Sequence, residues 1–100
     1  MIIELLVRNH PGTLSHITGL FARRAYNLES ILCTPVGNGT QSRVLLQVAT
    51  TPALVQVERQ LEKLHDVLSL RTRPDLSPDI FQAEFRAGVS TPLSDPESLG

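Results

Sequence analysis

Residues 28–50 read LESILCTPVGNGTQSRVLLQVAT, and their pattern determines how the middle of the chain is arranged. Residues 28–34 and residues 42–50 both alternate aliphatic with polar side chains over much of their length, the period-two pattern of a β-strand. Between them, residues 35–40 gather proline, glycine and asparagine, the residue types of a tight turn. The sequence therefore predicts two antiparallel strands joined as a hairpin.

The segment before this hairpin has the pattern of a strand followed by a helix. Residues 2–9 are rich in β-branched and aliphatic side chains, with Ile3 and Val7 on one face. After a break at residues 10–12, apolar side chains recur at helical spacing from a start near Thr13, which predicts an amphipathic helix. Its apolar stripe consists of Leu14, Ile17, Phe21 and Ala25.

The segment after the hairpin has the pattern of a helix followed by a strand. Thr51 can cap a helix that has Pro52 at its first position and runs to about residue 65, and residues 67–71 alternate as a fourth strand. The apolar stripe of this helix consists of Leu54, Val57, Leu61 and Leu64. The order βαββαβ, with a hairpin between the middle strands, predicts an α+β, ferredoxin-like plait in which two helices cover one face of an antiparallel sheet.

The sheet face opposite the helices is left open and carries aliphatic residues, since Ile2 and Leu6 alternate with the inward-facing side chains of the first strand. A sheet that is apolar on both faces needs a partner on the second. We therefore expect a homodimer, formed through sheet edges or helices. Gly19 inside the first helix costs about 1 kcal/mol relative to alanine, which indicates either a close neighbouring backbone or simple tolerance.

Composition limits the function classes. A chain of 100 residues has the size of one domain, and its net charge of −1 without a basic cluster argues against nucleic acid or a membrane surface as a partner. The apolar N-terminus is short and is interrupted by Glu4, so neither a signal peptide nor a membrane helix of roughly 20 residues is expected. Cys33 is the only cysteine, which suits a reducing cytoplasm, and a small packed thiol is its expected role.

The composition changes near residue 73, and this change predicts two parts. Residues 1–73 form the folded domain, and residues 74–100 are a Pro/Ser-rich C-terminal tail. A short apolar segment near residues 80–85 interrupts the tail with Ile80, Phe81 and Phe85. Such side chains need a surface to dock on, either this chain's own sheet or a partner.

The turn between the first strand and the first helix is the candidate site. Asn9, Pro11 and Gly12 place an amide side chain beside a tight turn and beside the unpaired N–H groups that open a helix. Such a helix end favours a carboxylate. A free amino acid would offer a carboxylate to these donors, an ammonium to the amide oxygen, and a side chain to an aliphatic wall. The alternative is that these residues only make and cap the turn.

Other uses of the plait lack their signatures. An RNA-binding plait needs aromatic side chains on its central strands, and residues 2–9 and 42–50 contain none. A metal-carrying plait needs paired cysteines after its first strand. His10, His16 and His65 are expected to be solvated rather than ligands or bases. The sequence contains no nucleophile paired with a base and no phosphate-binding loop, so we expect that the chain is not an enzyme. The alternative is a small enzyme with the plait fold, and catalytic turnover by the isolated chain would indicate it.

Residues 7–32, VRNHPGTLSHITGLFARRAYNLESIL, closely resemble the small subunit of acetolactate synthase (acetohydroxyacid synthase). This run is more specific than the general ACT-domain pattern N-x-P-G-x-L. Residues 60–68, QLEKLHDVL, also resemble the family's Q-L-x-K-L-x-D-V. The likeness extends over residues 1–73.

The resemblance implies a regulatory subunit that dimerises, activates the large catalytic subunit, and confers feedback inhibition by valine in branched-chain amino-acid biosynthesis. It implies thiamine diphosphate, magnesium and FAD on that partner and no cofactor on this chain. Valine would bind between the first loop and helix of one copy and the start of the second strand of the other. The implied effector contacts are Asn9, Pro11, Gly12, Thr13, Leu14, Asn27 and Leu28.

Two departures from the family pattern stand out. Longer members continue into a C-terminal domain where this sequence has a short tail, so it resembles a short-form or truncated subunit. Thr13 also stands where members often have alanine or valine. A stand-alone ACT-type amino-acid sensor that serves another enzyme or a transcription factor is the remaining alternative.

Overall fold

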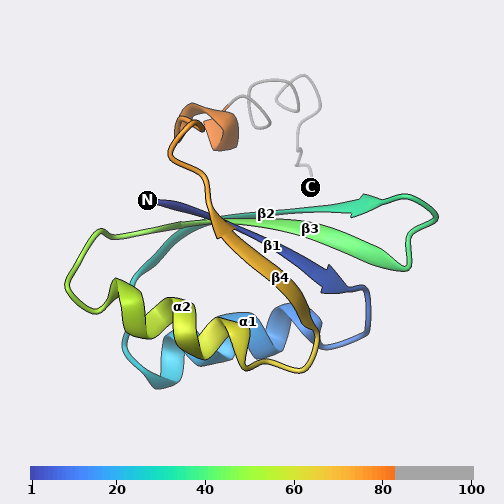
Figure 1. Cartoon of the computed structure of the whole chain (residues 1–100), viewed down its shortest axis with the longest axis horizontal. Coiled ribbons are helices and arrows are strands. Elements are labelled where there is room, and N and C mark those ends of the chain that lie inside the picture. Colours follow the sequence, from blue (N-terminus) through green and yellow to red (C-terminus); the bar gives the residue numbers. More distant parts are fainter. Residues whose placement is uncertain (83–100) are drawn as a thin grey trace, which may run out of the picture.

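The computed structural model describes residues 1–82 and confirms the predicted element order. The elements are β1 (Ile2–Arg8), α1 (Thr13–Arg23), β2 (Leu28–Val36), β3 (Gln41–Val48), α2 (Leu54–Glu62) and β4 (Val67–Thr72). The strands form one antiparallel sheet in the order β2-β3-β1-β4, with β2 and β4 at its edges. Both helices lie on the same face of this sheet (Figure 1). The predicted ferredoxin-like fold is therefore confirmed.

The core lies between the sheet and the two helices. Leu5 of β1 is opposite Val44 of β3 and Leu70 of β4, so the inward side chains of neighbouring strands meet in register. The helices close this layer with Ile17 from α1 and Leu61 from α2, both almost fully buried. Burying each such side chain contributes about 1.5–3 kcal/mol, which explains why the alternating pattern determines the strand faces.

The ends of the helices differ from the prediction. Leu14 is 42% exposed and Ala25 lies beyond the end of α1 at a positive φ of 57°, so the buried face of α1 contains Leu20 instead. α2 begins at Leu54, not at Pro52, and ends at Glu62. The Thr51 hydroxyl accepts a bond from the Ala53 N–H at 3.2 Å, which holds the turn before the helix rather than its first turn.

The open face carries aliphatic side chains, as predicted, but two of them are already buried in a single copy of the chain. Ile2 and Leu45 both alternate with core residues and so lie on this face, yet they are only 3% and 8% exposed. Glu4 also lies on this face and pairs with Arg71 at 3.4 Å and with Arg73. Leu6, the other aliphatic residue predicted for this face, is half-buried, and the homodimer stays a prediction.

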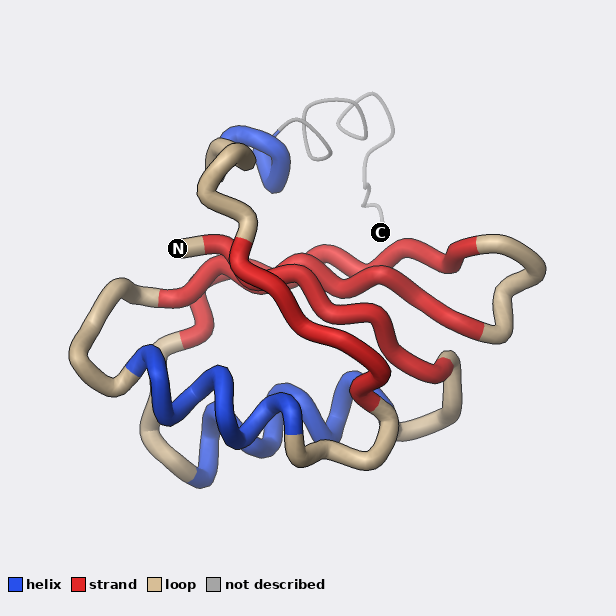
Figure 2. The backbone as a smooth tube through the Cα atoms, viewed as in Figure 1, coloured by secondary structure: helices blue, strands red, loops and turns tan. Residues whose placement is uncertain are grey.

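The chain after β4 continues along the sheet before it turns away. The Arg73 N–H donates to the Ile2 carbonyl at 2.8 Å, and the Arg73 guanidinium pairs with Asp75. A helical turn at residues 79–82 follows on the side of the sheet away from α1 and α2 (Figure 2). Ile80 and Phe81 in this turn are half-buried. Phe85, the third residue of the predicted docking segment, lies outside the described residues.

Candidate functional site

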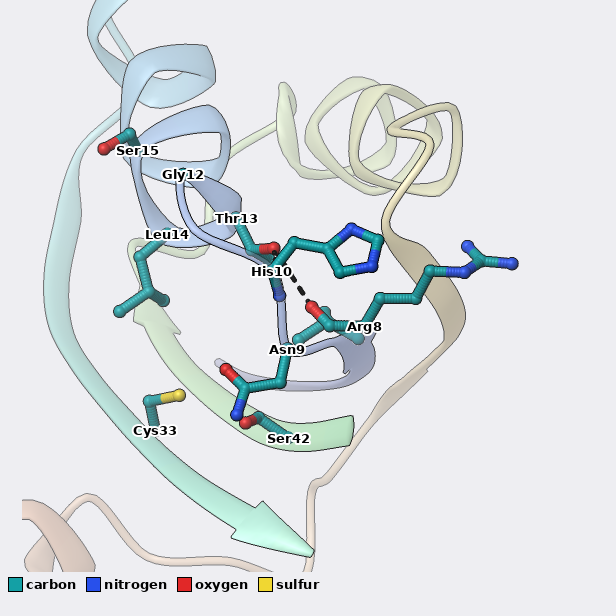
Figure 3. Close-up of a pocket in the computed structure, with 10 residues that line it drawn as sticks. Arg8, Asn9, His10, Gly12, Thr13, Leu14, Ser15, Cys33 and Ser42 are labelled. Atoms are coloured by element: carbon teal, nitrogen blue, oxygen red, sulfur yellow. Dashed lines mark hydrogen bonds between the residues drawn. The ribbon is translucent and has the colours of Figure 1, made fainter. Parts of the chain in front are cut away.

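A hollow of about 170 Å³ opens beside the turn that joins β1 to α1 (Figure 3). It is smaller than the sites of about 300–1,000 Å³ that hold drug-sized ligands. The hollow is lined by Val7, Arg8, Asn9, His10, Gly12, Thr13, Leu14, Ser15, Cys33 and Ser42. Four of the seven predicted contacts, Asn9, Gly12, Thr13 and Leu14, therefore line one hollow. A further predicted contact, Pro11, lies in the same turn.

The start of α1 provides hydrogen-bond donors to this hollow. Its N-cap residue is Gly12, which has a left-handed backbone (φ 89°) and no side chain to cap the helix. The Thr13 N–H donates to the His10 carbonyl at 3.1 Å, but within residues 1–82 the N–H groups of Leu14 and Ser15 have no acceptor. An anion with two oxygens fits this position.

Asn9 is held by one end of its amide. Its Nδ2 donates to the Gly39 carbonyl at 2.8 Å and its backbone N–H donates to the Thr40 carbonyl at 2.9 Å, both in the turn between β2 and β3. The amide oxygen accepts no hydrogen bond from any residue in the described part of the chain. Since this oxygen can accept two bonds, it can receive an ammonium group.

The floor of the turn is a buried polar network that the sequence did not predict. The Thr13 hydroxyl lies 3.0 Å from the Arg8 carbonyl and 3.1 Å from Oδ2 of buried Asp66, while Oδ1 of Asp66 lies 3.1 Å from Nδ1 of His10. Burial opposes ionisation of Asp66, but the Thr13 hydrogen bond and the neighbouring His10 together lower its pKa below the ordinary value. His10, His16 and His65 are exposed, as expected, but the first two are not simply solvated, because His16 Nδ1 also lies 3.9 Å from Oδ2 of Asp66.

Two side chains could form the apolar wall of the hollow. Leu14 points away from the core, and Cys33 lies on the edge strand β2 with its thiol exposed (Figure 3). The prediction that Cys33 is a packed thiol is therefore wrong: it faces the helix side of the sheet, but β2 is an edge strand and nothing in the described part of the chain buries it. The alternating pattern predicts which face of the sheet a side chain lies on, but it does not show that β2 is an edge strand whose side chains stay exposed.

Asn27 and Leu28, the other two predicted contacts, lie elsewhere. Leu28 is paired with Val48 at one end of the sheet, whereas Arg8 is paired with Gln41 at the other end, beside the turn that carries Asn9. Asn27 lines a separate hollow of about 190 Å³ between the end of α1 and the start of α2. One copy of the chain therefore does not bring all the predicted contacts together.

Residues 3–69 match the family model described as the AHAS small subunit-like ACT domain. The chain belongs to this family. It is 44% identical over 81 residues to the acetolactate synthase isozyme 1 small subunit of Escherichia coli strain K12, a match that covers 81% of this chain and 83% of that protein. The acetolactate synthase small subunit of Haemophilus influenzae is 38% identical over 90 residues, with 86% of this chain and 55% of that protein covered.

Solved structures agree with this ACT domain assignment. The crystal structure of the acetolactate synthase small subunit from Thermotoga maritima superposes with a TM-score of 0.65 at 31% identity, covering 73% of this chain and 47% of that one. The ACT domain from GTP pyrophosphokinase of Chlorobium tepidum shares the fold at 19% identity and a TM-score of 0.54, covering 72% of this chain and 94% of that one. Among residues 1–82 of this ACT domain there is no cluster of side chains that could hold a metal ion and no helix with the length and hydropathy to cross a membrane.

Proposed function

We propose that this chain is the regulatory subunit of an acetolactate synthase. The chain would bind valine, activate the large catalytic subunit and make that subunit sensitive to feedback inhibition by valine. The observation that carries the proposal is that Asn9, Leu14 and Ser15 line one small hollow, where the Leu14 and Ser15 N–H groups and the Asn9 amide oxygen have no partner within residues 1–82. Membership of the small-subunit family supports the same function.

The groups of the hollow match the groups of a free amino acid. The start of α1 would bind the carboxylate, because its N–H groups and its dipole both favour an anion. The Asn9 amide oxygen would accept a hydrogen bond from the ammonium, and Leu14 with Cys33 would contact an aliphatic side chain. Thiamine diphosphate, magnesium and FAD would belong to the catalytic subunit, where the reaction takes place.

A homodimer would complete this site. β2 is an edge strand, Ile31 on it is 38% exposed, and Leu14 at the start of α1 is 42% exposed. A twofold axis through β2 would pair two β2 strands antiparallel, and the sheet would continue across both copies. Because this axis reverses the strand, it would bring Asn27 and Leu28 of the partner subunit to the sheet end that carries Asn9.

The proposal is tested by adding the purified chain to the catalytic subunit and measuring acetolactate formation during a valine titration. We expect the chain to raise the rate without valine and to make the rate fall as valine is added. Calorimetry on the chain alone should show valine binding. A chain that binds valine but leaves the catalytic subunit unchanged would be a sensor for another protein, and acetolactate formation by the chain alone would contradict a regulatory role.

A further inference from the structure

Asp66 is a buried carboxylate that the proposed effector contacts do not use. It lies in the turn between α2 and β4, more than fifty residues from the β1–α1 turn in sequence, yet its two oxygens reach Thr13 and His10 there, each at 3.1 Å. The Asp66 carbonyl also accepts the Arg8 N–H at 2.9 Å, and the neighbouring His65 carbonyl accepts Nη1 of Arg8 at 2.8 Å. The α2–β4 turn therefore packs behind the β1–α1 turn and is hydrogen-bonded to it.

Other hydrogen bonds also hold the β1–α1 turn: the Thr13 hydroxyl lies 3.0 Å from the Arg8 carbonyl and 3.3 Å from the His10 N–H, and Asn9 is bonded to the β2–β3 turn. None of these bonds brings a negative charge to the start of α1. Gly12 provides no capping side chain, and the first turn of α1 contains no acidic residue. Asp66 supplies the missing negative charge near this helix end from a distant part of the chain. It does so through the Thr13 hydroxyl, and it makes no hydrogen bond to the N–H groups of Leu14 or Ser15. Asp66 can therefore hold the start of α1 while those two donors stay unoccupied.

We infer that Asp66 is the positioning residue of the effector site. It holds Thr13 and His10 so that the N–H groups of Leu14 and Ser15 point together into the hollow, ready for one carboxylate. This inference rests on the proposed function for its ligand, but the shape of the turn can be measured without any ligand. It also assigns a role to the aspartate of the QLEKLHDVL stretch, which lies outside every predicted contact.

The test compares variants that separate the shape of Asp66 from its acceptor oxygens. Asp66→Ala removes both oxygens, whereas Asp66→Asn keeps the shape and one acceptor for the Thr13 hydroxyl. Thr13→Val removes the hydroxyl that contacts Asp66, the Arg8 carbonyl and the His10 N–H, and Thr13→Ser restores it. Glu62→Ala is the matched control, because Glu62 is an exposed acid at the end of α2. Each full-length variant is studied by thermal unfolding, by the amide NMR resonances of Leu14 and Ser15, and by calorimetry with L-valine.

Asp66→Ala and Thr13→Val should move the amide resonances of Leu14 and Ser15. Both should also weaken valine binding about tenfold or more, because a displaced N–H group loses its hydrogen bond to the charged carboxylate of valine. Thr13→Ser should restore both readouts, Asp66→Asn should restore part of them, and Glu62→Ala should change neither. Should Asp66→Ala fail to fold, Asp66→Asn and the two Thr13 variants decide by the same readouts.

A purely structural role would give a different result. The melting temperature would fall, while the two amide resonances and the valine affinity of the folded protein stayed as in the unmodified chain, and that result would overturn the inference. If the unmodified chain binds no valine, the proposed function fails instead. The amide resonances would still show whether Asp66 shapes the turn.

Discussion

Asn9 uses the two ends of its side-chain amide for different purposes. Its nitrogen is bonded to the Gly39 carbonyl, which ties the β1–α1 turn to the β2–β3 turn, and its oxygen remains available. Asn27 is exposed and has no such bond within residues 1–82. The two asparagines should therefore differ in what they contribute to folding, even if each binds one charged end of the effector.

Asn9→Ala and Asn27→Ala should each weaken valine binding by roughly ten- to hundredfold, because each removes a hydrogen bond to a charged group worth about 1.5–3 kcal/mol. Asn9→Ala should also destabilise the fold by about 0.5–1.5 kcal/mol, whereas Asn27→Ala should leave it unchanged. Calorimetry and chemical denaturation measure the two effects. Unchanged affinity in both variants would mean that the effector binds elsewhere.

Gly12 is required for its backbone and not for the space around it. Its φ is 89°, and a Cβ added there would meet no atom within 4 Å. Gly12→Val should therefore lose stability through backbone strain, by about 1–2 kcal/mol, and should abolish valine binding by moving the start of α1. Gly12→Ala should show the same effects more weakly, because alanine is not β-branched. A Gly12→Val variant that binds valine normally would contradict the role of this turn.

Within residues 1–82 of a single copy of the chain, no contact of helix α1 explains why residue 19 is a glycine. A Cβ at Gly19 would meet only Nη1 of Arg23, at 3.2 Å, and this flexible side chain can move. No neighbouring backbone in the described chain requires the glycine, so Gly19→Ala should stabilise the helix by up to about 1 kcal/mol. Thermal unfolding combined with sedimentation tests this. A loss of stability or of dimer would show that a second copy packs closely against Gly19.

The segment after β4 is the element with the least explained role. Its first residue, Arg73, makes the last backbone hydrogen bond to β1, and all the core side chains among residues 1–82 precede this segment in the sequence. Deleting residues 75–100 should therefore leave the fold and valine binding intact, while activation of the catalytic subunit falls because Ile80 and Phe81 are removed. Acetolactate formation with the truncated chain measures this effect. Loss of folding would show instead that the segment belongs to the domain.

Most of the elements could be predicted from the sequence because their signals are local. The period-two pattern of residues 42–50 identified β3 and its buried face, and the spacing of Val57 and Leu61 identified α2. The helix ends were less predictable: Leu14 fits the apolar stripe of α1 but lies beside the edge strand, where one copy cannot bury it. The contact between Asp66 and Thr13 had no local signal, since it depends on how the whole sheet is folded.

At the scale of the whole molecule, the sheet separates residues that the proposed site needs together. Asn9 follows β1 at one end of the sheet, and Asn27 precedes β2 at the other. If the effector site contains both, then each dimer has two sites, and each site takes Asn9 from one subunit and Asn27 from the other. This arrangement makes a prediction that a site within one chain does not make.

Mixing the two asparagine variants tests the shared site. In a mixed dimer of Asn9→Ala with Asn27→Ala, one site receives both alanines, and the other receives both intact asparagines. Calorimetry on such dimers, isolated with two different affinity tags, should show one high-affinity valine site per dimer, although neither parent variant has one. If each chain bound valine with its own Asn9 and Asn27, both sites of the mixed dimer would contain one alanine. Valine binding would then stay as weak as in the parents, which would rule out a site built across the β2 edge.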